Sequence, residues 1–240
     1  MNIAHIVFSA HGNTLSIAQY VYTRSGGEFF DVTLPPARTK LPQICDTLFV
    51  YVPVYSASFP KPLKPVFSTI KTRRLIIIAT HGRMTKGRVW RDVASAIEHE
   101  QLLGLFSIPQ KHTYKDETVR VDLSDLARFI TLFTNKQLKP IAMPKEKPYR
   151  IARLSEPLRT AYNVKITIDP KRCTECMQCV KACPTEAIQS DLTITRACIR
   201  CIRCVQTCEE NAIHYTQSRL LRWYLKKIKT PHVSSVYASR

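Results

Sequence analysis

Eight of the nine cysteines in this chain of 240 residues lie in its last third, in two runs of identical spacing. The first run is Cys173, Cys176, Cys179 and Cys183, and the second is Cys198, Cys201, Cys204 and Cys208. Both follow C-x2-C-x2-C-x3-C, and the second repeats the first 25 residues later. Three closely spaced thiolates can bind three corners of one small cluster, whereas the fourth cysteine is carried off by the start of a helix. The spacing therefore predicts ligation of metal by clustered thiolates.

Two other uses of cysteine fit this pattern poorly. Structural zinc usually takes two separated cysteine pairs, not a tight triplet followed by a fourth cysteine. Disulfides require an oxidising compartment, and the N-terminus shows no secretory signal, so we expect a cytoplasmic protein with reduced thiols. The duplicated run instead favours two [4Fe–4S] clusters, which would also stabilise a small unit whose own core is thin.

Residues 166–215 resemble the bacterial-type ferredoxin domain with two [4Fe–4S] clusters. The resemblance implies that the fourth cysteine of each run binds the cluster of the other run. Cluster 1 is then held by Cys173, Cys176, Cys179 and Cys208, and cluster 2 by Cys198, Cys201, Cys204 and Cys183. One departure is Glu209, which stands where the family usually has the proline seen at Pro184. Cys45 lies outside both runs and is interpreted as an inert core thiol.

A second candidate site lies near the N-terminus, in the turn Ser9-Ala10-His11-Gly12-Asn13-Thr14 between a predicted strand and a predicted helix. A helix N-terminus presents unpaired N–H groups and a positive dipole end, so this turn suits a phosphate. The chain lacks both GxxxxGK[ST] and GxGxxG, which argues against a nucleotide-hydrolysing P-loop and a dinucleotide fold. An ordinary strand–turn–helix connection remains the alternative.

Residues 1–136 resemble a flavodoxin, whose FMN-phosphate loop usually reads S/T-x-T-G-N-T. The resemblance places two further flavin loops after the third and fourth strands, where the ligand of such a sheet lies. The implied FMN-binding residues are Ser9, Ala10, His11, Gly12, Asn13, Thr14, Tyr55, Ser56, Ala57, His81, Gly82 and Arg83. Neither flavin loop has a tryptophan, so stacking on the flavin rests on Tyr55, His81 or Tyr114. Each of these also has an ordinary interpretation as a rim or loop residue.

The elements that position these residues alternate between strand and helix. Predicted strands cover 3–9, 28–34, 48–55, 75–80 and 103–108, and predicted helices cover 14–24, 62–70, 88–101 and 122–136. This alternation predicts an α/β fold, a flavodoxin-like doubly wound parallel sheet covered on both faces. A small α+β two-cluster ferredoxin domain follows it. The predicted organisation is a flavodoxin-like domain at 1–138, a basic proline-rich linker at 139–165, the ferredoxin domain at 166–215 and a basic amphipathic tail at 216–240.

The formal net charge is +18, and the basic excess lies outside the cysteine-rich segment. This charge predicts attraction to an acidic redox partner protein. In the tail, Leu221, Leu225 and Ile228 share one helical face, which Leu220 and Tyr224 widen. We favour a helix that packs on its own protein, with an interfacial helix on an anionic membrane as the alternative. Nucleic acid is not expected as a partner, because no aromatic–basic pattern of a known binding module is present.

The order of domains resembles that of flavodoxin–ferredoxin fusion proteins. It predicts an electron carrier or oxidoreductase that passes electrons between two [4Fe–4S] clusters and a bound FMN, toward a partner or substrate that the sequence does not name. No catalytic base or nucleophile is recognised. The rival hypothesis is a ferredoxin whose flavin-free flavodoxin-like domain serves as a docking or scaffold module.

Overall fold

The computed structural model describes residues 2–55, 57–82, 86–115, 117–145, 162–227 and 234–238. Two of the expected flavin-loop residues, Ser56 and Arg83, lie outside these ranges, as do 146–161 of the predicted linker. Within the described residues, no helix is both long enough and apolar enough to span a bilayer.

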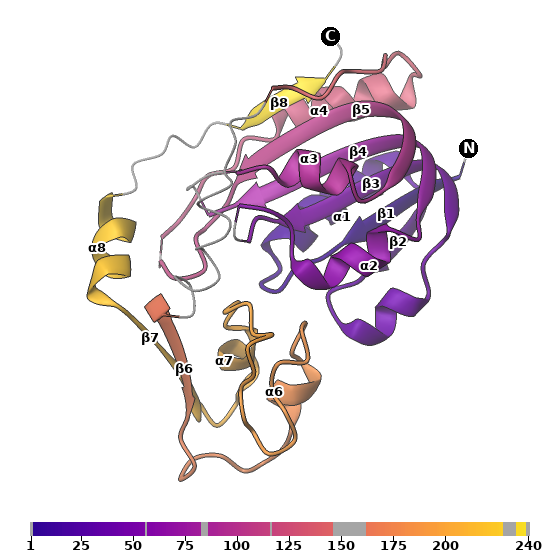
Figure 1. The fold of residues 1–240 in the computed structure, drawn as a ribbon. Coiled ribbons are helices and arrows are strands. Elements are labelled where there is room, and N and C mark those ends of the chain that lie inside the picture. Colours follow the sequence, from indigo (N-terminus) through magenta and orange to yellow (C-terminus); the bar gives the residue numbers. More distant parts are fainter. Residues whose placement is uncertain are drawn as a thin grey trace.

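A central sheet of six strands forms the larger part of the molecule (Figure 1). Its strands are β1 (Ile3–Val7), β2 (Glu28–Asp31), β3 (Ile44–Pro53), β4 (Lys71–His81), β5 (Glu98–Pro109) and β8 (Ser235–Ala238). The spatial order is β2-β1-β3-β4-β5-β8, with the first five strands parallel and β8 antiparallel to β5. The order 2-1-3-4-5 is that of flavodoxin-like sheets, so the predicted α/β class is confirmed.

Helices cover both faces of this sheet. One face packs against α1 (Asn13–Ser25) and α4 (Ser124–Thr134), and the other against α2 (Lys64–Phe67) and α3 (Val89–Ala94). Two short 3-10 turns, η1 (Pro35–Thr39) and η2 (Lys61–Leu63), lie in the connections. Successive residues of a central strand point to opposite faces, so Phe49 belongs to the α1/α4 core and Val50 to the α2/α3 core. The near-continuous apolar strands seen in the sequence follow from this two-sided burial.

The predicted helix over 88–101 is too long by two turns. Helix α3 ends at Ala94, and the chain enters β5 at Glu98. The charged start of β5 pairs with β4, where Lys71 Nζ lies 2.9 Å from Glu98 Oε2 and Arg73 Nε lies 3.6 Å from Glu100 Oε2. The cross-strand ladder therefore prevails over the local helical pattern.

The smaller module contains β6 (Val164–Ile168), α6 (Gln178–Lys181), α7 (Arg203–Thr207) and β7 (Ile213–Gln217), and β6 pairs antiparallel with β7. The sequence repeat is reproduced in the backbone. Three pairs of residues with positive φ recur at the offset of 25: Glu175 and Arg200, Met177 and Ile202, and Glu186 and Asn211. Both cysteine runs therefore form the same loop.

The start of the predicted linker and much of the predicted tail pack against the folded domains. The N–H of Ile141 donates to the Leu102 carbonyl at 2.7 Å, so the described start of the linker lies against β5. The tail is split into the end of β7, helix α8 (Arg219–Lys227) and strand β8. Because β8 pairs with β5 and Tyr237 packs edge-on against Trp90, the last described strand forms an edge of the first domain's sheet.

His5 is a buried polar residue in the core of the larger domain, with none of its surface exposed. Its Nε2 is 3.0 Å from the Gly26 carbonyl, which can only accept, so Nε2 carries the proton and Nδ1 accepts from the Tyr51 hydroxyl at 2.8 Å. The neutral ring is thus fully paired. Burial lowers the pKa of His5 to about 4, although the Gly26 hydrogen bond opposes this shift.

This lowered pKa predicts acid sensitivity. The unfolded chain binds a proton at His5 below its ordinary pKa and the folded chain does not, so stability is present above that value and is lost as the pH falls toward 4. Between pH 7 and pH 5 we expect His5 to remove about 2 kcal/mol from the free energy of unfolding. Urea unfolding at several pH values should show this loss in the wild type and a smaller one in His5→Gln. The exposed His214→Gln is the matched control, and equal pH dependence in wild type and His5→Gln would contradict the prediction.

Candidate iron–sulfur and flavin sites

The four cysteines assigned to cluster 2 line one small cavity. Cys198, Cys201 and Cys204 of the second run face Cys183 of the first across it, and isoleucines complete the wall. Burial is the first cause that raises the pKa of Cys201 and of Cys204 to about 12, and the neighbouring thiols, Cys183 among them, contribute to the rise. Cys183 of the first run thus lies with three cysteines of the second.

The other three cysteines of the first run, Cys173, Cys176 and Cys179, do not line this cavity. Burial raises the pKa of Cys179, with Cys173 and Cys176 contributing as near neighbours, whereas Cys176 is exposed to solvent. Cys208 packs with Cys179 in the module's buried cluster. Among the described residues, no three His, Cys, Asp or Glu side chains converge as they would around a single metal ion. The cysteines around a multi-iron cluster lie farther apart than the ligands of a single ion.

Equivalent backbone groups contact the fourth cysteine of each run. The N–H of Ala187 donates to Cys183 Sγ at 3.2 Å, and that of Ala212 donates to Cys208 Sγ at 3.3 Å. N–H groups directed at ligand sulfurs are one of the means by which a protein adjusts cluster potentials. Glu209 leaves this turn intact, since the same contact forms after Cys208 as after Cys183.

The strained backbone of both loops also points to a ligand. Ile202 is β-branched and has a φ of 55°, a conformation that costs on the order of 1–2 kcal/mol for a non-glycine residue. Such strain persists only where the surroundings enforce it, and it concentrates at binding sites. The donors and the four-sulfur cavity fit an iron–sulfur cluster.

The N-terminal turn forms as predicted between β1 and α1. Gly12 has a φ of 86°, which a side chain rarely tolerates, and a Cβ placed there would meet no atom within 4 Å. The glycine is therefore required for its conformation, and the space beside it is open. Gly12, which precedes α1, has no side chain to cap the helix, and the Leu15 N–H is taken by Ser9 Oγ, so among the described residues the N–H groups of Asn13 and Thr14 are those left to an anion.

The two hydroxyls of this turn are used to hold its shape. Ser9 Oγ accepts from the Leu15 N–H at 3.1 Å, and Thr14 Oγ1 is hydrogen-bonded to Thr80 Oγ1 at 2.8 Å, both largely buried. The resemblance to flavodoxins places both residues at the FMN. Both also line the open space beside the turn, together with Ala10, His11 and Asn13.

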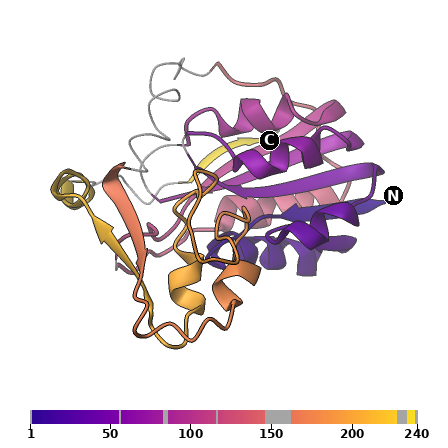
Figure 2. The same ribbon diagram turned by 60° about the horizontal axis from the view of Figure 1, so that its bottom comes forward.

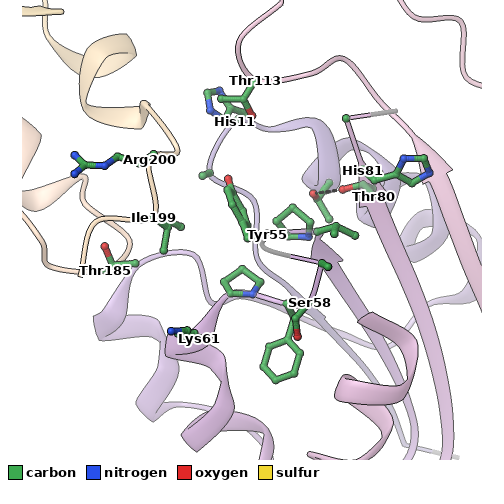
Figure 3. Close-up of a pocket in the computed structure, with 18 of the residues that line it drawn as sticks. His11, Tyr55, Ser58, Lys61, Thr80, His81, Thr113, Thr185, Ile199 and Arg200 are labelled. Carbon is green, nitrogen blue, oxygen red and sulfur yellow. Dashed lines mark hydrogen bonds between the residues drawn. The ribbon is translucent and has the colours of Figure 1, made fainter. Parts of the chain in front are cut away.

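A cleft of about 1710 Å³ opens beside this turn, at the carboxyl ends of β3, β4 and β5. Tyr55 lies within it, with Ser58 and Lys61 below and His81 on the far wall (Figure 3). Two buried polar atoms on the cleft residues, His81 Nδ1 and Gln110 Nε2, have no hydrogen-bond partner among the described residues. Their unpaired groups and the open α1 N-terminus fit a ligand with one phosphate and a polar ring system, as FMN has.

Not every expected flavin residue has the same surroundings. Ala57 and Gly82 line or flank the cleft, with Ala57 at a φ of 57°. A Cβ on Gly82 would lie 2.6 Å from the His112 ring, so that position requires glycine for space. Tyr114, one of the three stacking candidates, directs its hydroxyl to the Arg200 carbonyl and so packs against the ferredoxin module.

The ferredoxin module closes the cleft from the side (Figures 1 and 2). His11 Nε2 donates to the Cys201 carbonyl, and Arg203 Nη1 donates back to the Ala10 carbonyl at 3.0 Å. Arg38 Nη2 donates to the Pro184 carbonyl at 2.6 Å, and Cys201 itself belongs to the α2/α3 core of the larger domain. The turn predicted to bind phosphate therefore lies in direct contact with the second cysteine run.

Apart from Tyr114, sequence reasoning missed the loop after β5, and it missed the contribution of the ferredoxin module to the cleft. The loop that follows β5, from Gln110 to Tyr114, borders it together with Thr185, Arg196 and Ile199. The rule that ligands lie at the carboxyl ends of parallel strands was sufficient to find the β5 loop. No comparable signal exists for the ferredoxin residues, because they arrive through tertiary contacts.

Comparisons with known proteins agree with the assignment of an iron–sulfur site in the smaller module. Residues 166–189 match the family of 4Fe-4S binding domains, and the chain carries such a domain there. Two solved structures are similar to the chain: an NADH:FMN oxidoreductase in its apo form (16% identity, 60% of this chain and 91% of that chain, TM-score 0.42), and the Trp repressor binding protein from Bacillus subtilis (12%, 59% and 100%, TM-score 0.32). A search of curated protein sequences found no match.

Proposed function

We propose that this protein passes electrons between two [4Fe–4S] clusters and a bound FMN. The observation that carries the proposal is the contact between the second cysteine run and the turn beside the cleft, through His11 and the Cys201 carbonyl and through Arg203 and the Ala10 carbonyl. A cluster held by Cys201 would lie next to the turn that takes the FMN phosphate. When bound, FMN supplies the exchange between one-electron and two-electron chemistry.

The chain's own residues prepare both sites. Backbone N–H groups of α1 and of Gly12's turn receive the phosphate, while Tyr55, His81 and Gln110 border the space for the ring. Among the described residues that line the cleft, Asp92 is the one carboxylate. It accepts from Ser58 Oγ at 2.6 Å and lies 4.0 Å from Arg88 Nε, whose positive charge offsets its own. Cys176, assigned to cluster 1, is exposed, whereas Cys198, assigned to cluster 2, lines both the cysteine cavity and the cleft.

Cofactor content after anaerobic purification tests this proposal. We expect about eight iron and eight acid-labile sulfide per chain. Denaturation should release FMN, because the turn offers one phosphate site at a helix N-terminus. Cys45→Ser is the control for loss of a cysteine outside the runs and should keep all the iron. An iron-free, zinc-loaded protein would contradict the cluster assignment. Release of FAD would contradict the assignment of FMN. Iron-replete protein that takes up no flavin on reconstitution would favour the rival hypothesis, a ferredoxin with a flavin-free docking domain.

A further inference from the structure

Helix α8 exposes large apolar side chains on one face. Leu220 is 64% exposed, Trp223 54% and Tyr224 46%, and they lie at the i, i+3 and i+4 positions that share a helix face. The opposite stripe is the one that packs, since Leu225 is only 4% exposed. The sequence analysis favoured a helix that packs its widened apolar face on its own protein. The structure shows that Leu220 and Tyr224 do not take part in such packing.

The same helix carries only positive charge. Four of its nine residues are basic and all four are exposed, namely Arg219, Arg222, Lys226 and Lys227. The Lys227 ammonium lies 4.0 Å from the centre of the Trp223 ring, so charged and apolar groups are interleaved. The helix contains no acidic residue that would neutralise this charge.

The position of α8 leaves this surface accessible. Both ribbon views show it at the margin of the molecule, beyond β7 and apart from the central sheet (Figures 1 and 2). Its start is held in place, because the Ser218 N–H donates to the Asn163 carbonyl at 2.9 Å. Tyr162, which precedes Asn163 in the sequence, is 83% exposed and adds an aromatic ring at this end of α8.

We propose that α8 docks on an anionic lipid surface. Leu220, Trp223 and Tyr224 would enter the boundary between headgroups and acyl chains, and the four basic side chains would bind lipid phosphates. Aromatic residues favour this boundary, and helices that combine an apolar face with a lysine- and arginine-rich face bind it. Attraction to an acidic protein would account for the four basic side chains. It would not account for the three exposed apolar side chains beside them, which a lipid surface would bury. Leu220 and Tyr224 also line the cleft, so docking would bring the rim of the proposed flavin site to the lipid surface. The lipid binding itself does not rest on the proposed electron transfer.

Vesicle binding of the purified full-length protein tests the proposal. We expect cosedimentation with phosphatidylcholine vesicles that contain phosphatidylserine to be at least about tenfold stronger than with phosphatidylcholine alone, and to weaken as salt rises. Trp223 gives a second signal, a shift of its emission to shorter wavelength on binding. The chain's other tryptophan, Trp90, is fully buried and should not respond.

Paired variants separate insertion from simple charge attraction. Leu220→Ser with Trp223→Ser should weaken binding about tenfold, whereas Ile44→Ser, at a residue 73% exposed on β3, should not. Arg222→Gln with Lys226→Gln should also weaken it, compared with the equal charge loss of Lys40→Gln with Arg128→Gln elsewhere on the surface. Iron content and circular dichroism confirm that each variant is folded.

Two results would overturn the proposal. One is binding to anionic vesicles that is no stronger than binding to neutral ones. The other is wild-type binding by the Leu220→Ser, Trp223→Ser variant, which would mean that the overall charge of +18 acts alone and that α8 is as suited to an acidic protein as to lipid. Neither outcome depends on flavin or on the number of clusters, so each is distinguishable from failure of the proposed function.

Discussion

Replacing Cys201 with serine is expected to slow reduction of the flavin by about two orders of magnitude when electrons are supplied by a low-potential one-electron donor. Cys201 joins the cavity of the second cluster to the turn beside the cleft, through its sulfur on one side and its carbonyl on the other. Without that cluster, the remaining one at Cys176 has no neighbour toward the cleft. An intramolecular route is then replaced by slower collisions with the donor.

Anaerobic rapid mixing that follows flavin and cluster absorbance separately measures this effect. In the wild type, flavin reduction should lag behind cluster reduction and should not depend on protein concentration. Cys176→Ser should slow it as well, whereas Cys45→Ser, which removes a buried thiol outside both runs, should match the wild type. If flavin in Cys201→Ser is reduced as fast as in the wild type, the donor reaches the flavin directly and the two modules work independently.

Replacing Cys183 with serine is expected to destroy the cluster of the second run and to spare that of its own run. The Cys183 sulfur lines the same cavity as Cys198, Cys201 and Cys204, although it lies only four residues after Cys179. Iron should fall from about eight to about four per chain. The low-temperature electron paramagnetic resonance spectrum of the reduced protein should change from that of two interacting clusters to that of one isolated cluster.

Double variants decide which cluster is lost. Cys183→Ser combined with Cys201→Ser should keep about four iron, because both substitutions act on the same cluster and their effects do not add. Cys183→Ser combined with Cys176→Ser should keep almost none, because each removes a different cluster. The reverse pattern would show that each run binds its own cluster with all four of its cysteines.

Much of the fold could be predicted because its determinants are local or periodic. Apolar runs such as that around Val50 fix the strands, and the cysteine repeat anticipates a duplicated loop, including the positive φ at Met177 and Ile202. The start of β5 could not be predicted from its own residues. Glu98 and Glu100 become strand residues through their partners on β4, which lie far away in the sequence.

The candidate site was less predictable than the fold, for a related reason. The phosphate turn could be located from its glycine and its place before a helix. The use of its side chains could not, since His11 meets Cys201, 190 residues away, and Arg38 meets Pro184, 146 residues away. Such contacts depend on how two modules dock. The spacing of motif residues within either module does not predict how the two modules dock.

Strand β8 follows the ferredoxin module in the sequence but belongs to the sheet of the first domain, and this changes how the two modules are connected. Because β8 completes the sheet next to β5, the ferredoxin module is an insertion attached at both ends rather than an appendage on one linker. After a single proteolytic cut before the module, the module would remain attached to β8, which pairs with β5; after a cut behind the module, it would remain attached through the linker. Separation of the modules would also release less chain entropy than with one free end, because the inserted segment remains a closed loop while β8 is paired. The second cysteine run is thus kept beside the cleft by chain connectivity as well as by the contacts of His11 and Arg203.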